Sequence, residues 1–275
     1  MFADLALARR IERAEASLSA DIAAAILARG EVPNGFQHPV GGGVAVCAGP
    51  ASPVTKVIGV GFDGALDESA LEALEAEFVA CASPVRAEVS TLADPAFARQ
   101  LTTRGYTLFG FENVLARPLS GSAPPVLPDG TAIGPAPDHG TFMNVLIDGF
   151  ASPDLGVVAT LGESFPREIL ERTFADMATA RGFSRYLATV DGAAASAASM
   201  RLCDGIAQLC GAATLPPFRR RGLQTALLHA RLHAAANDGC DVAVVTTEPG
   251  SKSQQNAQRA GFVLLYSRAI LIKEP

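Results

Sequence analysis

The chain has 275 residues, of which 49% are hydrophobic and 18% are charged, the composition of an ordinary globular protein. A formal net charge of -6 argues against a nucleic acid as the main partner, because no global basic field attracts a phosphate backbone. No stretch approaches the roughly 20 apolar residues of a membrane span, which excludes an integral membrane protein. The first thirty residues mix arginines with acidic residues, which favours an amphipathic helix over a signal peptide.

The cysteines are odd in number, widely spaced and mostly set among apolar neighbours. Neither a disulfide framework nor a metal-ligand spacing is apparent. We therefore expect reduced core residues in a cytoplasmic protein, and no metal site. They are Cys47, Cys81, Cys203, Cys210 and Cys240.

The first half of the chain alternates helical and strand patterns. We expect helices near 3–29, 67–81 and 95–104, and strands near 43–47, 54–60, 85–91 and 106–115. Residues 119–140 are rich in Pro, Gly and Ser and carry neither period, so this segment is predicted to be a linker. The predicted domains are therefore 1–118 and 141–275.

The second half has clearer boundaries. Asp191-Gly192 and Asp204-Gly205 favour tight hairpin turns and predict three consecutive antiparallel strands. Apolar residues recur at helical spacing from Leu223 onward, which predicts a helix ending near Gly239. The expected helices are 144–151, 166–180, 223–239 and 251–260, and the expected strands are 185–190, 193–202, 206–215, 241–247 and 262–272.

An internal repeat connects the two halves. Placing Gly105 on Gly261 defines an offset of 261 - 105 = 156 residues. The same offset places Val89–Thr91 on Val245–Thr247 without a gap, so that strand, helix, Gly-aromatic pair and strand recur.

The segment most informative about chemistry lies between a predicted strand and a predicted helix, at residues 216–226. The first turn of a helix leaves backbone N–H groups unpaired and carries partial positive charge, so an anion such as a pyrophosphate is its natural occupant. Gly222 permits close approach of a phosphate, three arginines add positive charge, and Thr225 can contribute a hydroxyl. The alternative is a solvated charged loop; the order of the surrounding elements favours the anion site.

This segment resembles the pyrophosphate loop of the GNAT superfamily of acetyl-CoA-dependent N-acyltransferases, Gln/Arg-x-x-Gly-x-Gly/Ala. Here the motif is Arg219-x-x-Gly222-x-Gln224, with Gln in place of the last small residue. The resemblance covers residues 141–275 well and the first 120 only through the repeat. It implies an α/β (α+β) fold of two GNAT-like domains, each a mixed, mostly antiparallel sheet flanked by helices.

The resemblance also implies an acetyl-CoA site. The backbone of Ala213 and Thr214 would pair with the pantetheine arm where the sheet splays. Ser251, Ser253 and Asn256 lie where such proteins often contact the CoA tail, although helix capping by Ser251 and surface polarity explain them equally well. The loop residues expected at the cofactor are Arg219, Arg220, Arg221, Gly222, Leu223, Gln224 and Thr225.

The catalytic groups are less well defined. Many family members have a Tyr four residues before the closing Gly-Phe, and here that residue is Ala257. Histone-acetylating members carry a Glu where this chain has Gln208, which can orient a water but cannot titrate. Gln208 is either a weak catalytic candidate or a polar residue facing out of a strand. Otherwise catalysis rests on proximity, with solvent as the acid, or on another residue of the cleft. The further candidates, without decisive spacing, are Asp148, Glu163, Asp191 and Tyr266.

The repeat offset places acidic residues in the first half where the loop lies in the second. Arg219 falls on Asp63, Gly222 on Leu66 and Gln224 on Glu68. Like charge opposes a pyrophosphate, so we expect this copy to bind no CoA and to help shape the acceptor cleft. A purely structural role in burying an edge of the second half is the alternative.

The sequence therefore predicts an acetyl-CoA-dependent N-acetyltransferase acting on an amine, with neither nucleic acid nor membrane as partner, as a monomer or homodimer. A non-catalytic acyl-CoA-binding or regulatory module is the alternative, and a longer acyl-CoA is a further possibility. The acceptor itself is not identified by any motif.

Overall fold

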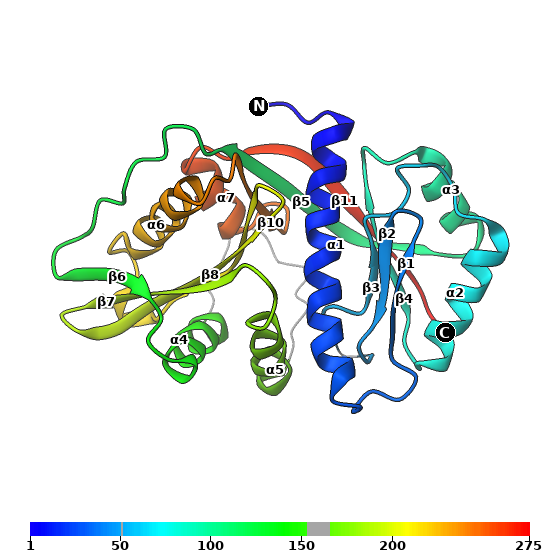
Figure 1. The fold of residues 1–275 in the computed structure, drawn as a ribbon, viewed down its shortest axis with the longest axis horizontal. Helices are drawn as coiled ribbons and strands as arrows, with labels where there is room; N and C mark the ends of the chain where they lie inside the picture. The colour runs from blue at the N-terminus through cyan, green and yellow to red at the C-terminus, as the bar shows by residue number, and fades with distance from the viewer. Residues whose placement is uncertain (51, 153–165) are drawn as a thin grey trace.

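The structure, a computed structural model, describes residues 1–50, 52–152 and 166–275. Its described strands form one 11-stranded sheet in the order β1-β2-β3-β4-β11-β5-β10-β9-β8-β7-β6. Helices lie on both faces of this sheet, and α1 crosses its middle (Figure 1). The sheet therefore runs without a break through both halves of the chain.

The first half contributes one long helix and a compact strand–helix unit. Asp4 caps α1 by accepting a hydrogen bond from the N–H of Leu7, and Asp94 caps α3 in the same way at Ala96. The elements are α1 (Leu5–Ala28), β1 (Phe36–Val40), β2 (Gly43–Cys47), β3 (Lys56–Ile58), α2 (Glu68–Ala80), β4 (Val85–Ser90), α3 (Pro95–Thr103) and β5 (Thr107–Pro118).

The second half repeats this order after an added strand and two helices. Asp191 and Asp204 adopt positive φ at the two hairpin turns, as the Asp-Gly pairs predict. The elements are β6 (Thr131–Pro135), α4 (His139–Ala151), α5 (Arg167–Met177), β7 (Phe183–Val190), β8 (Ala193–Cys203), β9 (Ile206–Thr214), α6 (Leu223–Asn237), β10 (Val242–Thr247), α7 (Lys252–Arg259) and β11 (Val263–Lys273).

The strand pairing is the same in both halves. In the first, β1, β2 and β3 are antiparallel neighbours and β3 pairs with β4 in parallel. In the second, β7, β8 and β9 are antiparallel and β9 pairs with β10 in parallel. The repeat in the sequence therefore corresponds to a repeat in the fold, and the chain forms two GNAT-like units in one sheet.

The two halves exchange their last strands. β5 lies beside β10 of the second half, β11 lies beside β4 of the first, and β5 and β11 pair with each other at the centre. In that pairing Arg268 lies opposite Glu112, and these two residues also differ by the repeat offset, 268 - 112 = 156. A pseudo-twofold axis therefore passes between Glu112 and Arg268.

Charged side chains are buried at this axis beneath α1. Glu12 of α1 accepts hydrogen bonds from the Tyr266 hydroxyl (2.7 Å) and from Arg268 Nε (2.9 Å). The side chains of Glu12 and Arg268 are only 2% and 1% exposed. Arg268 also lies 3.5 Å from Glu112 and 3.9 Å from Glu88, and Glu88 pairs with Lys56 at 3.2 Å. The network joins α1 to strands of both halves.

Separate cores cover the two faces of the sheet. Phe78 of α2 and Phe97 of α3 pack on one face of the first half, and Leu232 of α6 packs on the same face of the second. On the opposite face, α1 packs against both halves: Ile22 belongs to a core with β2, and Ile11 to a core with β9 and β10. α1 therefore belongs to the first half in sequence and packs against both halves in the fold.

Most expected elements are present within a few residues of their predicted ends, and the predicted α/β architecture is confirmed. Two strands were not predicted. β1 is interrupted by Pro39, and β6 lies inside the segment 119–140 that was expected to lack strands. β6 forms because residues 131–135 pair with β7 along its outer edge, a long-range contact that local composition does not reveal. The boundaries of the predicted domains stay a prediction.

The expectation of reduced cysteines is wrong for two of them. Cys47, at the end of β2, and Cys81, at the end of α2, form a disulfide across the first-half core. The fold brings them together over 34 residues, so their spacing in the sequence gave no signal. Disulfides are rare in cytosolic proteins, so this pair removes one observation behind the cytoplasmic location, which stays a prediction.

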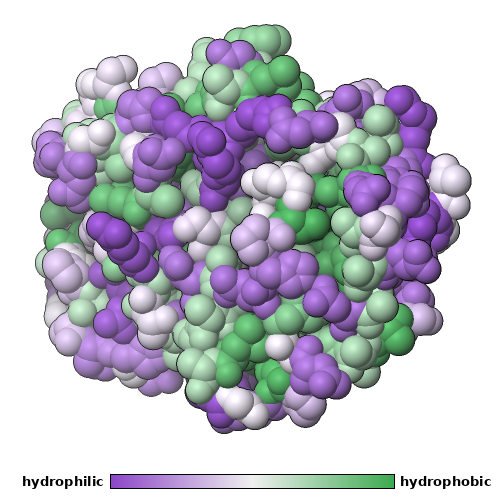
Figure 2. All heavy atoms as spheres, turned by 45° about the vertical axis from the view of Figure 1, so that its right-hand side comes forward, coloured by the Kyte–Doolittle hydropathy of each residue, from purple (hydrophilic) through white to green (hydrophobic). Residues whose placement is uncertain are grey.

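None of the helices among the described residues is long and apolar enough to cross a membrane. Figure 2 shows hydrophilic and hydrophobic residues interleaved over the side on which the first half comes forward.

Candidate functional site

The sheet splays in the second half. The parallel strands β9 and β10 pair only at Val242–Ile206, Ala243–Ala207 and Val244–Gln208. Beyond Gln208, β9 continues to pair with β8 alone, and beyond Val244, β10 pairs with β5 alone. One backbone edge of each strand therefore faces the opening between them, which is a place where an extended ligand can add backbone hydrogen bonds.

The loop after β9 leads directly to the N-terminus of α6. Gly222 caps this helix with φ of 79°, a conformation that favours glycine, and no side chain among the described residues caps it. The first helical hydrogen bond runs from the N–H of Ala226 to the carbonyl of Gly222 (3.0 Å). The N–H groups of Leu223, Gln224 and Thr225 have no acceptor in the described part of the chain. They form a cluster of donors at a helix N-terminus, as an anion site requires.

Two of the three arginines of the loop are exposed. Arg220 has positive φ, and the guanidinium carbon of Arg221 lies 5.9 Å from the centre of the Phe218 ring. Thr225 is also exposed, in the first turn of α6. These exposed side chains lie next to the N–H groups at the start of α6, where they could contact a bound anion.

Arg219 serves a different purpose. Its Nε donates to the carbonyl of Thr214 (3.0 Å), and its Nη2 donates to the carbonyl of Gly149 (3.1 Å) and to that of Ser152. The guanidinium thereby ties the loop to the end of β9 and to the C-terminal end of α4. The structure thus places the first motif residue as a support of the loop, while the backbone of the loop and Arg220–Arg221 face outward.

The three polar residues at α7 that were expected to contact the CoA tail differ in what they contact. Asn256 Nδ2 donates to Gln224 Oε1 (3.2 Å), so this residue does lie at the loop. Ser251 Oγ accepts from the N–H of Gln254 (3.1 Å), which is the capping role considered as the alternative. Ser253 is exposed on α7.

The end of β9 carries the expected backbone segment and a bulge. Ala213 and Thr214 are buried, and the Ser196 hydroxyl donates to the Ala213 carbonyl (2.8 Å). The register shifts between Ala198–Ala212 and Ser199–Cys210, which leaves Gly211 as an extra residue on β9. Such a bulge leaves one backbone unit outside the ladder and bends the strand. It lies midway along the splayed part of β9.

Two aromatic rings approach this bulge. A methyl group added at Gly211 would lie 3.0 Å from ring atoms of Phe174 and 3.6 Å from the ring of Phe150. The two rings stack with their centres 6.2 Å apart. α4 and α5 thus form an apolar wall on one side of the bulge.

Gln208 is at the vertex of the splay, as the last residue of β9 that pairs with β10. It is buried, its Oε1 accepts from Arg201 (3.0 Å), and its Nε2 donates to Glu15 Oε2 of α1 (3.1 Å). Gln208 faces out of the strand, as the alternative had it, but toward α1 and not toward solvent; its catalytic role stays a prediction. This position of β9 thus carries an amide, and the hydrogen bond from that amide holds the carboxylate of Glu15, from the first half, beside it.

Ala257 packs in a core with α6 and is only 6% exposed. Tyr266 lies in the buried network at the pseudo-twofold axis, and burial raises the pKa of its hydroxyl. Neither side chain is exposed at the loop, and Tyr266 is committed to Glu12.

The remaining candidates are dispersed. Asp148 pairs with Arg167 at 2.7 Å on the surface, and the N–H of Asp191 donates to Gly130 at a hairpin turn. Glu163 lies outside the described residues. No group of metal-ligating side chains comes together in the part of the chain that the structure describes.

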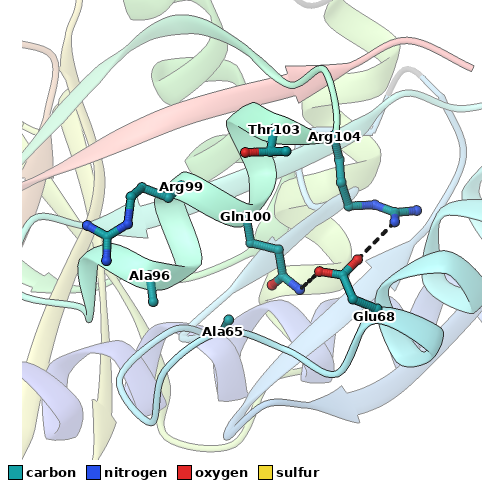
Figure 3. Close-up of a pocket in the computed structure, with 7 residues that line it drawn as sticks. All are labelled: Ala65, Glu68, Ala96, Arg99, Gln100, Thr103 and Arg104. Atoms are coloured by element: carbon teal, nitrogen blue, oxygen red, sulfur yellow. Dashed lines mark hydrogen bonds and ion pairs between the residues drawn. The ribbon is translucent and has the colours of Figure 1, made fainter.

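The equivalent place in the first half is a hollow of about 500 Å³ between the N-terminus of α2 and one side of α3 (Figure 3). Gln100 holds the loop before α2: its Oε1 accepts from the N–H of Leu66 (2.9 Å), the repeat equivalent of Gly222, and its Nε2 donates to Glu68 (2.7 Å). Arg104 also pairs with Glu68, at 3.1 Å. Gln100 and Glu68 are the repeat equivalents of Asn256 and Gln224 (256 - 100 = 224 - 68 = 156). The contact between the two helices is therefore present in both halves, and in the first half Gln100 also binds the N–H of Leu66.

Comparison with known proteins agrees with this geometry. Residues 156–262 match the acetyltransferase (GNAT) family. This part of the chain is a GNAT domain. No curated protein matches the sequence.

Solved structures extend the likeness to both halves. A GCN5-related N-acetyltransferase from Kribbella flavida has a TM-score of 0.63 and 21% identity over 94% of this chain and 96% of its own. A tandem GNAT protein from the clavulanic acid biosynthesis pathway has a TM-score of 0.60 and 16% identity, covering 86% of this chain and 81% of its own. A GCN5-related N-acetyltransferase from Sphaerobacter thermophilus has a TM-score of 0.54 and 16% identity, covering 74% and 65%. At these identities the likeness concerns the tandem GNAT fold.

Proposed function

We propose that the second GNAT unit transfers an acetyl group from acetyl-CoA to an amine. The observation that carries this proposal is that the N–H cluster at the start of α6, which has no acceptor among the described residues, lies after the strand that forms the splay between β9 and β10. The pyrophosphate of CoA would bind the N–H groups of Leu223–Thr225 and the side chains of Arg220, Arg221 and Thr225. The pantetheine arm would then follow the free edge of β9 past Ala213 and Thr214 toward Gly211.

Acyl transfer needs a base, because most amines are protonated at neutral pH and only the free amine attacks. The amine nitrogen bonds to the thioester carbon, the carbon–sulfur bond breaks, and the sulfur leaves as a thiolate with the bonding electron pair. We propose Glu15 as the group that takes the amine proton, directly or through a water. It is held by Gln208 at the vertex of the splay, and its side chain is 24% exposed, so a substrate proton can reach it.

This assignment gives the first half a role in catalysis. Glu15 belongs to α1, which packs against both halves, and Lys56 of β3 lies 3.9 Å from it. The first copy binds no CoA in this proposal, because the Glu68 carboxylate, which Gln100 holds at the start of α2, opposes a pyrophosphate there.

A test of the function is acetyl-CoA turnover with a panel of primary amines, comprising amino acids, polyamines, aminoglycosides and peptides with a free N-terminus. Formation of free thiol together with an acetylated amine supports the transferase. Tight acetyl-CoA binding without turnover on any amine would instead favour the non-catalytic acyl-CoA-binding module. Competition by longer acyl-CoAs measures the chain-length preference in the same assay.

A further inference from the structure

A buried arginine lies directly behind the bulge of β9. Arg231 of α6 is 4% exposed, and no carboxylate of the described residues lies within ion-pair distance of it. Its Nη1 donates to the carbonyl of Ser199 (2.9 Å) and to that of Cys210 (3.4 Å), and its Nε donates to the carbonyl of Leu227 (3.3 Å). The charge is therefore held by backbone carbonyls alone.

An arrangement of this kind does not serve stability. Removing a cation from water without a counter-ion costs several kcal/mol, which carbonyl dipoles only partly offset. Burial lowers the pKa of Arg231 to about 10, and the side chain still carries its proton at neutral pH. The other fully buried arginines behave differently: Arg201 pairs with Asp21, and Arg268 pairs with Glu12. An unpaired charge kept at such a cost suggests a functional reason.

The guanidinium of Arg231 lies at the bulge of β9. Ser199 and Cys210 are the pair on one side of the register shift, and Gly211 is the extra residue. The carbonyl of Cys210 and the N–H of Gly211 belong to the same peptide unit. Because the two groups of a trans peptide point in opposite directions, the Gly211 N–H points away from Arg231. A hydrogen bond from a cation to the carbonyl polarises the unit and strengthens its N–H as a donor.

The first half lacks this arrangement. The repeat equivalent of Arg231 is Glu75 (231 - 75 = 156), a carboxylate that pairs with Arg104 and Lys273 at 2.8 Å each. The strand before its helix, β3, has only three residues and carries no bulge. Among the described residues, a buried arginine therefore faces the strand in the copy that has the splay, and a paired carboxylate takes its place in the other.

We propose that Arg231 is a positioning residue for acyl transfer, which fixes the bulge at Gly211 and directs positive potential through the Cys210–Gly211 peptide at the thioester carbonyl. This inference rests on the proposed function. As the amine attacks, the carbonyl π electrons move to oxygen, and when the carbon–sulfur bond breaks they return and the charge passes to sulfur. A fixed positive potential near both atoms stabilises this charge. It is needed here because Ala257 can donate no proton to the leaving thiolate.

The test is the infrared carbonyl frequency of acetyl-CoA labelled with ¹³C at the thioester carbonyl, free and bound to the purified full chain. We expect the frequency to fall on binding to the wild type. Arg231→Lys keeps the charge and should retain most of the shift. Arg231→Gln keeps a hydrogen-bond donor but loses the charge, and should lose most of the shift. His233→Gln is the matched control, since His233 contacts the carbonyl of Ser122 from the same helix, away from the bulge.

The binding measurement separates the possible failures. Each variant should bind acetyl-CoA within about threefold of the wild type, so that a change in frequency reports the polarity of the site and not its occupancy. A full shift in Arg231→Gln would overturn the inference and leave the proposed function intact. A wild type that binds acetyl-CoA without lowering the carbonyl frequency would overturn it too, even where the variants fail to fold. A wild type that binds no acetyl-CoA would overturn the proposed function itself.

Discussion

The two halves of this protein follow the same chain path but differ where the second half has its site. The strand before the helix has nine residues in β9 and three in β3. In one half Gly222 begins the helix and two exposed arginines precede it; in the other, Gln100 binds the N–H of Leu66, the equivalent of Gly222, and Glu68 lies at the helix start. A buried cation, Arg231, faces the strand in one half and Glu75 replaces it in the other. The fold is therefore retained in both halves, while the features that we propose to bind a ligand occur in the second.

The same comparison shows what the first half has gained. It carries the disulfide Cys47–Cys81, whereas Cys203, the repeat equivalent of Cys47, is unpaired (203 - 47 = 156). It also supplies α1, whose Glu12 and Glu15 reach the centre of the sheet and the vertex of the splay. The first half thus acts as a support that completes the second.

The largest expected effect is on the contact between the halves. Arg268→Met removes the cation from the buried network and leaves Glu12, Glu88 and Glu112 without it, so we expect the free energy of unfolding to fall by about 3–5 kcal/mol. Urea unfolding measures the change. Arg9→Met breaks the exposed pair with Asp63, which solvent screens, and should cause a much smaller loss. Equal losses in the two variants would contradict a special role for the axis.

The next effect concerns the first-half core. Replacing both Cys47 and Cys81 by Ala opens a crosslink over 34 residues, so the free energy of unfolding should fall by about 2–4 kcal/mol. Cys203→Ala, at the equivalent strand position of the other half, is the control and should change it by less than about 1 kcal/mol. Acetyl-CoA affinity should be unchanged in both. A loss of affinity in the double variant would mean that the first core shapes the CoA site.

The proposed base provides a direct link between the halves. Glu15→Gln should lower the rate of acetyl transfer about 100-fold with little change in acetyl-CoA affinity. The exchange Glu15→Gln/Gln208→Glu moves the carboxylate from α1 to β9 while keeping the hydrogen-bonded pair, and should restore much of the rate. Rates of the single and double variants as a function of pH test this. An unchanged rate in Glu15→Gln would remove Glu15 from the mechanism.

The smallest effect is a pH dependence of stability. Burial, with the Glu88 carboxylate adding to it, raises the pKa of Glu112 from 4.5 to about 7. The folded state then keeps a proton that the unfolded chain releases, so stability should fall as the pH rises from about 4.5 to about 7. Glu112→Gln should flatten that part of the profile and raise the stability at pH 8 by about 1 kcal/mol. A profile of the same slope in the variant would show that another group titrates.

Local signals predicted most of this fold, and long-range contacts account for what they missed. Turn signals such as the Asp-Gly pairs, together with apolar periods, placed the elements other than β1 and β6, and the offset of 156 residues anticipated two equivalent units. The exchange of β5 and β11, the pairing of β6 with β7 and the disulfide depend on partners far away in the chain, which local patterns do not encode.

The candidate site was predicted only in part. The helix end at Gly222 follows from the motif, because the loop and the helix are adjacent in the sequence. Glu15 could not be assigned, since it reaches Gln208 across 193 residues. Arg231 had a weak signal: it lies four residues after Leu227, on the apolar face of α6, where an arginine is unexpected.

The comparison of the halves is tested most directly by calorimetric titration of acetyl-CoA into three proteins. Arg221→Glu/Thr225→Glu places two negative charges at the helix end of the second half without touching Arg219. Ala65→Glu/Ser69→Glu places them at the equivalent positions of the first half (221 - 65 = 225 - 69 = 156). We predict one site per chain in the wild type, an affinity lower by on the order of 100-fold in the second-half variant, and an unchanged affinity in the first-half variant. Two sites in the wild type, or an equal loss in both variants, would contradict the account.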